Sequence, residues 1–324
     1  MKSEKLNLLR WSALLLSILS FIWVAGCSKN NQDIVGPQAN SGNNQAIEQI
    51  VLNDPSITSF EPNYNEEDAM SFALGKVATA IYPLSVGQHM YDVSRDFTVT
   101  YKGDTAYGKL TKTFKGVLII AGSYTKPAAG KPGIDTVITK DFTTTITRNV
   151  KLLRVGDTTK TDDGWKIIAT SLPEGGTLTS NVNITKMTLF MPDGDTLSIT
   201  SPKDYYLYRQ PGKWKQMPSI NRNSRLTVRV ELTSAYADTD FVTITHGAVY
   251  DNFKRGMHRE KVKFHLVSST PQNGVYNKIY EATWTTKQFM GYFHAVVNAY
   301  PKGAIFDDAA KVETDSWGLP YIVK

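Results

Sequence analysis

Hydrophobic and polar residues alternate at every second position over much of the chain beyond residue 95, as expected of strands with one buried face. The clearest case is residues 226–232, where Leu226, Val228, Val230 and Leu232 alternate with polar residues. Further strands are predicted at 97–101, 106–120, 142–153, 165–169, 182–189, 197–199 and 262–266, and the aromatic segment 317–323 predicts a last strand docked in the core.

Turn residues between these stretches predict antiparallel hairpins. Residues 102–104 read Lys-Gly-Asp, residues 162–164 read Asp-Asp-Gly, and residues 192–195 read Pro-Asp-Gly-Asp. Asp-Gly between alternating strands is typical of a tight turn. Asp193 and Asp195 could also suggest calcium, but the repeating acidic pattern of a calcium loop is missing, so a turn is expected.

Two segments near the N-terminal end have a helical period instead. Residues 46–52 predict a short helix, and residues 66–81 predict a longer one, in which Asn65 caps the first turn and the apolar positions share one face. Two helices before antiparallel strands, with Gly164, Trp165, Lys166 and Ile167 in a late hairpin, resemble the cystatin or nuclear-transport-factor-like fold over residues 46–172. That resemblance implies helices packed on a curved sheet.

The pattern as a whole predicts a mainly β protein, α+β overall, with two folded domains. We expect an α+β domain at 46–205, with N-terminal helices packed on an antiparallel curved sheet. An antiparallel β-sandwich is expected at 206–324. Its architecture could be immunoglobulin-like, although the chain offers no cysteine pair and no motif that fixes the topology. The boundary is placed within residues 201–218, which are rich in proline and aromatic residues.

The first 26 residues have the features of a secretory signal, because Lys2, Lys5 and Arg10 precede an apolar run at 11–24. The uncharged segment 11–26 is shorter than the roughly 20 residues that a helix needs to cross a bilayer. Its end, Val-Ala-Gly-Cys at 24–27, resembles a bacterial lipobox. The resemblance implies cleavage between Gly26 and Cys27, diacylglycerol on the Cys27 sulfur and fatty acylation, as palmitate, of the new amino group. The alternatives are an ordinary cleaved signal and an uncleaved anchor.

The residues after the lipobox bear on localisation. Ser28 is not acidic, which by resemblance to lipoprotein sorting in diderm bacteria implies the outer membrane, and the segment lacks the acidic run of some surface-exported lipoproteins. We therefore expect a lipid-anchored protein on the periplasmic side of the outer membrane. Residues 27–45, polar after Cys27, predict a flexible tether, because so few apolar groups cannot offset the entropy of ordering.

Composition excludes several classes of protein. The chain carries a net charge of +6, of which +2 lies in the signal, and acidic and basic residues are interspersed, so no nucleic-acid partner is predicted. Cys27 is the only cysteine, so no internal disulfide can form. Stability must come from packed cores.

No motif for a phosphate loop, a dinucleotide, a nucleophile elbow or a paired-histidine zinc site is present. No catalytic residue, metal or cofactor is therefore predicted. The basic segment 254–263 could touch lipid phosphate or an acidic glycan, although a solvated loop is favoured. The five histidines are scattered rather than spaced as ligands: His89, His246, His258, His265 and His294.

The best candidate for a binding surface is the aromatic group formed by Tyr205, Tyr206, Tyr208 and Trp214. Aromatic rings supply a large contact area together with a polar handle, which suits a sugar or a peptide. The alternative is that these side chains fill a seam between domains. We expect a lipid-anchored cell-envelope protein with a binding or scaffolding role. Its partners would be the membrane, through Cys27, and envelope proteins or glycan. Enzymatic activity is not favoured; an envelope hydrolase and a periplasmic solute-binding accessory protein are the alternatives.

Overall fold

The computed structural model describes residues 41–54, 57, 64, 81–128, 133–155, 164–177, 179, 181–210, 213–249 and 259–324. The region Ser41–Lys324 forms one compact unit. Strands make up 65% of the described residues, which confirms that the protein is mainly β. The lipobox with Gly26 and Cys27, the helix predicted at 66–81 up to residue 80, and the basic residues 254–258 lie outside the described residues.

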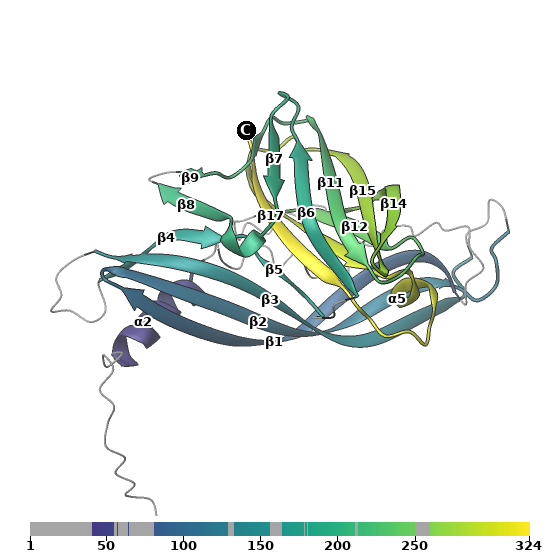
Figure 1. Ribbon diagram of the computed structural model, residues 1–324, viewed down its shortest axis with the longest axis horizontal. Coiled ribbons are helices and arrows are strands. Elements are labelled where there is room, and N and C mark those ends of the chain that lie inside the picture. The colour runs from purple at the N-terminus through teal and green to yellow at the C-terminus, as the bar shows by residue number, and fades with distance from the viewer. Residues whose placement is uncertain are drawn as a thin grey trace, which may run out of the picture. The chain divides into compact units, whose positions relative to one another are not determined.

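Two sheets contain the described strands, and they are antiparallel except for one short parallel pair (Figure 1). The smaller sheet runs β14-β15-β11-β6-β7 and comprises His265–Gln272, Val275–Thr285, Arg225–Ser234, Val182–Phe190 and Thr196–Ile199. The larger sheet comprises β1 Tyr82–Lys102, β2 Thr105–Ser123, β3 Thr136–Arg154, β4 Trp165–Ser171, β5 Glu174–Gly176, β8 Tyr206–Gln210, β9 Lys213–Lys215, β10 Ser219–Ile220, β12 Phe241–Val249, β13 Glu260–Lys263, β16 Gly291–Tyr300 and β17 Asp315–Val323.

Strands β1, β2 and β3 form a long antiparallel ribbon at the base of the fold (Figure 1). Gly103, at φ 58°, makes the predicted turn between β1 and β2. The alternation predicts a strand that begins near residue 97, but β1 begins at Tyr82. The difference arises because residues 82–96 pair along the whole apolar half of β2, so the partner strand, not their own alternation, fixes their conformation.

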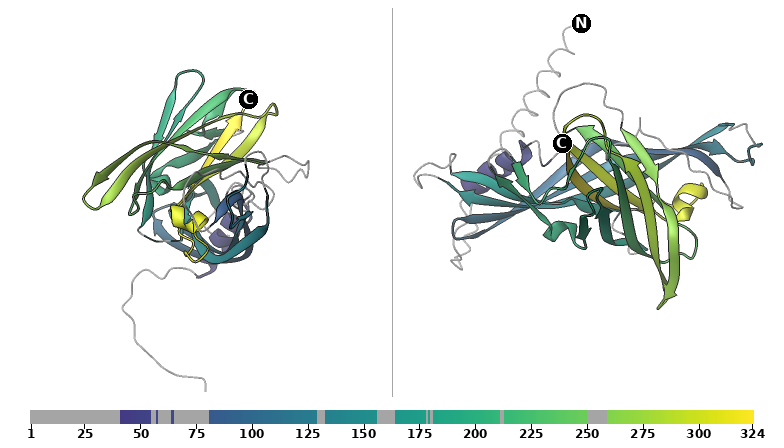
Figure 2. Two further views of the ribbon diagram at one scale, coloured as in Figure 1. Left: turned by 90° about the vertical axis from the view of Figure 1, so that its right-hand side faces the viewer. Right: turned by 90° about the horizontal axis from the view of Figure 1, so that it is seen from above.

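The larger sheet forks at β3. One edge of β3 pairs with β2 along its length. On the other edge, residues 145–147 pair with β5, while residues 150–154 pair with β4. The β5 branch continues through β17, β16 and β12 to β13, and the β4 branch continues through β8 to β9. Figure 2 shows the two branches from further directions.

The helices are short in the described part of the chain. Helix α2 spans Ser41–Leu52 and buries Ile47 and Val51 against β2, β3 and β4. It begins five residues before the expected start, within the predicted tether, where no apolar residue marks a helical period. Helix α5 spans Lys302–Phe306, and a 3₁₀ turn, η1, spans Pro202–Asp204. No helix among the described residues is long and apolar enough to cross a membrane.

The largest hydrophobic core lies between the two sheets. Residues of β6, β11 and β15 pack there against residues of β12, β16 and β17. The predicted last strand is confirmed as β17, whose apolar residues 317–323 are almost all buried. Strands from both sides of the expected boundary at 205/206 pair directly, β4 with β8 and β6 with β11. Whether the parts before and after residue 205 fold independently stays a prediction.

Candidate functional site

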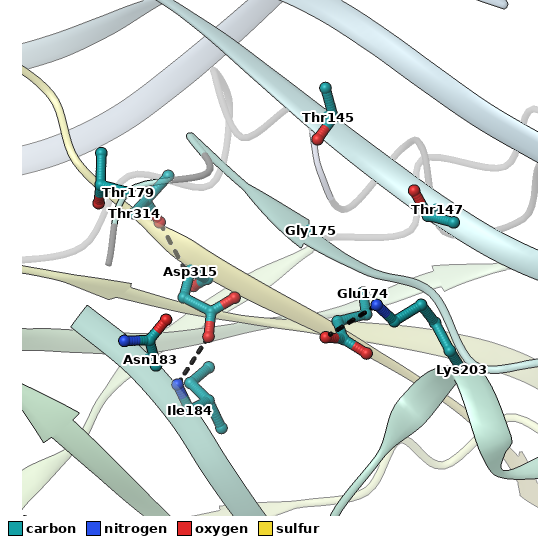
Figure 3. Close-up of a pocket in the computed structure, with 10 residues that line it drawn as sticks. All are labelled: Thr145, Thr147, Glu174, Gly175, Thr179, Asn183, Ile184, Lys203, Thr314 and Asp315. Carbon is teal, nitrogen blue, oxygen red and sulfur yellow. Dashed lines mark hydrogen bonds and ion pairs between the residues drawn. The ribbon is translucent and has the colours of Figure 1, made fainter. Parts of the chain in front are cut away.

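A cleft of about 280 Å³ opens where the larger sheet forks. Strand β3 forms one wall, β5 and the start of β17 form another, and residues of β6 and η1 complete it (Figure 3). The volume is close to the lower end of the range for small-molecule sites, about 300 to 1,000 Å³. The lining residues are Thr145, Thr147, Glu174, Gly175, Thr179, Asn183, Ile184, Lys203, Thr314 and Asp315.

Two consecutive glycines allow the branch to form. A Cβ atom on Gly175 would lie 1.7 Å from the Thr145 carbonyl oxygen, and one on Gly176 would lie 2.1 Å from the Thr314 carbonyl oxygen. Gly176 also has φ at 142°, which side-chain-bearing residues rarely adopt. The three-residue strand β5 can therefore bridge β3 and β17 only because both positions lack a side chain.

The charges on the rim of the cleft compensate each other. Lys203 Nζ lies 3.5 Å from Glu174 Oε1, and the two side chains are partly exposed, at 44% and 27%. Figure 3 shows Lys203 reaching from η1 across to Glu174 on β5. A partly exposed pair of this kind contributes little to stability, about 0 to 1 kcal/mol. The two side chains together carry no net charge at this point of the rim.

Asp315 lies deeper and connects the two sheets. Its Oδ2 accepts a hydrogen bond from the Ile184 backbone N–H of β6 at 2.6 Å, and its Oδ1 accepts one from the Ser316 N–H at 2.8 Å. Burial raises the pKa of Asp315 to about 7; nearby Glu174 acts in the same direction, while the two N–H donors and Lys203 oppose it. The carboxyl group is thus partly protonated at neutral pH.

Two threonine hydroxyl groups lie on the wall formed by β3. The Thr147 hydroxyl lies 3.2 Å from the Thr111 hydroxyl on β2. The Thr145 hydroxyl makes no hydrogen bond to any described residue, so it is available to a ligand. Both threonines stand on the same face of β3, two positions apart, and regular strand geometry therefore fixes their spacing at about 7 Å.

The chemistry of this lining suits a small, neutral and polar molecule. Within the residues that the structure describes, no three His, Cys, Asp or Glu side chains group in a way that could hold a metal ion. Among the described residues that line the cleft, Ile184 is the one large aliphatic side chain, so these residues offer little surface to an apolar ligand.

The four aromatic residues predicted as a binding surface do not share one face. Tyr205 and Trp214 are partly buried and pack against the main core. The Tyr205 hydroxyl donates to the Gln216 carbonyl at 2.9 Å, and the Arg209 guanidinium lies 5.1 Å from the Trp214 ring centroid.

Tyr206 and Tyr208 lie close together, with ring centroids 6.4 Å apart. Lys151 Nζ lies 3.7 Å from the Tyr206 centroid, which covers one face of that ring. Tyr208 is 39% exposed and borders a second, shallower hollow of about 360 Å³. None of the described residues that line this hollow also lines the cleft.

Two of the histidines are buried in the core. His246 is 1% exposed and stacks on Trp284, with ring centroids 4.9 Å apart. Its Nε2 lies 3.8 Å from Glu260 Oε2, and burial lowers its pKa to about 4. Burial also lowers the pKa of His294 well below the usual range.

The remaining candidates have simpler surroundings. His265 is exposed on β14, as its position on the polar face indicated, and His258 lies outside the described residues. The predicted turn at 192–195 is confirmed: the Met191 N–H donates to the Asp195 carbonyl at 2.9 Å, and β6 pairs with β7 on either side.

The chain matches no protein-family model and no curated protein. The cleft itself was not predicted from the sequence. Glu174 and Asp315 are 141 positions apart, and no periodicity marks β5. The signal that could have drawn attention to the fork is the pair Gly175 and Gly176 between two strands, since consecutive glycines there indicate a close backbone approach.

Proposed function

We propose that this protein is a lipid-anchored cell-envelope protein that binds a small polar ligand in the cleft at the fork of the sheet. One observation carries the binding role: a cleft whose polar walls are held by strands and whose rim charges compensate each other. Sites supported by strands hold their geometry more precisely than sites on loops. The lipobox ending at Cys27 supports the anchor, since two or more acyl chains hold a protein on a bilayer where one dissociates.

We further propose that the outer-membrane location and periplasmic orientation follow from Ser28. The finer architecture is also a proposal. The core shared by β6, β11 and β15 with β12, β16 and β17 supports a β-sandwich of immunoglobulin-like architecture, and α2 packed beneath β2, β3 and β4 supports the curved-sheet, cystatin-like description of the N-terminal part.

Two measurements test the two halves of this function. For the anchor, mass spectrometry of the protein from membranes should find an acylated Cys27 at the N-terminus. A Cys27→Ser variant should leave the membrane fraction. A mature N-terminus elsewhere, or an unmodified sulfur, would refute the anchor.

For the binding role, the mature protein is incubated with a low-molecular-weight extract of the envelope and studied by native mass spectrometry. We expect a bound small molecule. Thr147→Trp, which fills the cleft, should lose it, and Thr143→Trp, on the exposed part of the same face of β3, should keep it. Equal retention by both variants would place binding elsewhere.

A hydrolase is the second candidate function, and one observation favours it. Glu174 and Asp315 line the same cleft, and the pKa of Asp315 is raised to about 7, a value suited to a general acid. Release of a chromophore from glycoside or ester substrates, lost in both Glu174→Gln and Asp315→Asn, would support it. If the protein binds a ligand but turns over none of these substrates, the hydrolase proposal is refuted and the binding role stands.

A further inference from the structure

We infer that the ligand of the cleft is a small uncharged polyhydroxylated molecule, of the size of a monosaccharide or cyclic polyol, bound by the hydroxyls of Thr145 and Thr147 and the side chains of Asn183 and Glu174. This inference rests on the proposed binding function and names its ligand class.

The first argument is the inventory of lining groups. Threonine hydroxyls both donate and accept hydrogen bonds, an asparagine amide does the same with separate atoms, and a carboxylate accepts up to four. A ligand that carries several hydroxyl groups, each both donor and acceptor, matches such a mixed set. The Thr145 hydroxyl makes no hydrogen bond within the described chain, so filling the cleft gives it a partner without breaking an existing contact.

The second argument is charge. An anionic ligand would need an uncompensated cation, and the one lysine among the described lining residues, Lys203, lies 3.5 Å from Glu174. A cationic ligand would need a carboxylate open to it, but Glu174 pairs with Lys203 and both Asp315 oxygens already accept backbone N–H groups. A neutral ligand therefore matches these groups best.

The third argument is size and surface. A volume of about 280 Å³ is too small for an oligomer and ample for a single ring. None of the described residues that line the cleft is aromatic, so a sugar would bind them by hydrogen bonds without stacking. We therefore expect modest affinity, together with discrimination between epimers that place hydroxyls differently.

The experiment is isothermal titration of the mature protein with a panel of single-ring ligands. Neutral hexoses, pentoses and inositol form the expected binders; a uronic acid, a hexosamine and a dipeptide form the charged and peptide comparisons. Thr145→Val removes a hydroxyl at nearly constant shape, and we expect it to weaken binding about 2- to 13-fold, the loss of one hydrogen bond. Thr147→Trp should abolish binding. Thr143→Val and Thr143→Trp, on the exposed continuation of the same strand face, should bind as wild type.

The outcomes separate the ligand class from the function. If no neutral ring binds but a molecule from the envelope extract binds wild type and not Thr147→Trp, the function stands and the ligand class is wrong. Preference for the uronic acid or the hexosamine would refute neutrality. If rings bind Thr147→Trp as well as wild type, the site is wrong. If neither the panel nor the extract binds, both proposals fail. Thermal melts followed by circular dichroism show whether a variant that loses ligand binding is still folded. Thr145→Val is nearly isosteric, so it tests the site even if Thr147→Trp does not fold.

Discussion

Asp315→Asn should change how the stability of the protein depends on pH. In the folded protein the pKa of Asp315 is raised from its ordinary 3.8 to about 7, because burial disfavours the charged form. An acid whose pKa is raised on folding stabilises the fold while it is protonated and loses this contribution as pH rises toward the folded pKa. The window therefore runs from about pH 4 to about pH 7.

The magnitude follows from the shift. A difference of about 3 pKa units, at about 1.4 kcal/mol each, gives a loss of about 4 kcal/mol across that window, with no further loss above it. Asparagine does not titrate, so Asp315→Asn keeps a constant value. Its amide can accept only one of the two backbone N–H groups, from Ile184 and Ser316, which adds a pH-independent cost of about 1 to 3 kcal/mol.

Urea unfolding of wild type and Asp315→Asn at half-unit steps from pH 4 to pH 8 separates the two effects. We expect wild type to lose its advantage over the variant steadily between pH 4 and pH 7, and the difference to level off above pH 7. Because both proteins share every other titrating group, their difference isolates this carboxyl. If the free energy of unfolding of wild type minus that of Asp315→Asn is constant with pH, or increases as pH rises, the Asp315 carboxyl is not buried as the structure has it.

Three further predictions concern other sites. Lys278→Met should destabilise the protein by about 3 to 5 kcal/mol in urea unfolding, because it leaves the fully buried Asp240 carboxylate, 2.8 Å from Lys278 Nζ, without its cation; an effect under 1 kcal/mol would contradict this. Gly176→Ala should lower the melting temperature and abolish ligand binding, since its Cβ would meet the Thr314 carbonyl; wild-type melting and binding would refute the role of β5. Burial lowers the pKa of His246 from 6.5 to about 4, so the protein should lose about 3 kcal/mol of its free energy of unfolding as pH falls from 6.5 to 4. His246→Phe should remove that loss; the same dependence of stability on acidic pH in the variant would contradict the prediction.

The strands could be predicted because their signal is local. Leu226, Val228, Val230 and Leu232 alternate in the sequence, and each is buried in the core, while Gly194 makes the tight turn that its neighbours indicated. Alternation indicates that one face of a strand is buried, whichever strand lies beside it, so it predicts the strand even when the topology is unknown.

The site could not be predicted, because it depends on contacts between distant residues. Asp315 reaches its hydrogen-bond donor, Ile184, across 131 positions, and Thr145 becomes part of a wall only when β5 branches from β3. The aromatic cluster was a local signal of a different kind. Tyr205 precedes β8 and Trp214 lies on β9, and both pack against the main core, whereas Tyr206 and Tyr208 lie side by side on β8.

The most direct test of the binding claim is methyl NMR of the mature protein labelled at threonine, titrated with the tightest ring from the panel. We expect the methyl signals of Thr145 and Thr147 to shift as the ligand is added, while that of Thr143, two positions along the same face of β3, stays in place. Shifts confined to threonines away from the fork, or no shift at saturating ligand, would contradict the claim that the cleft is the binding site.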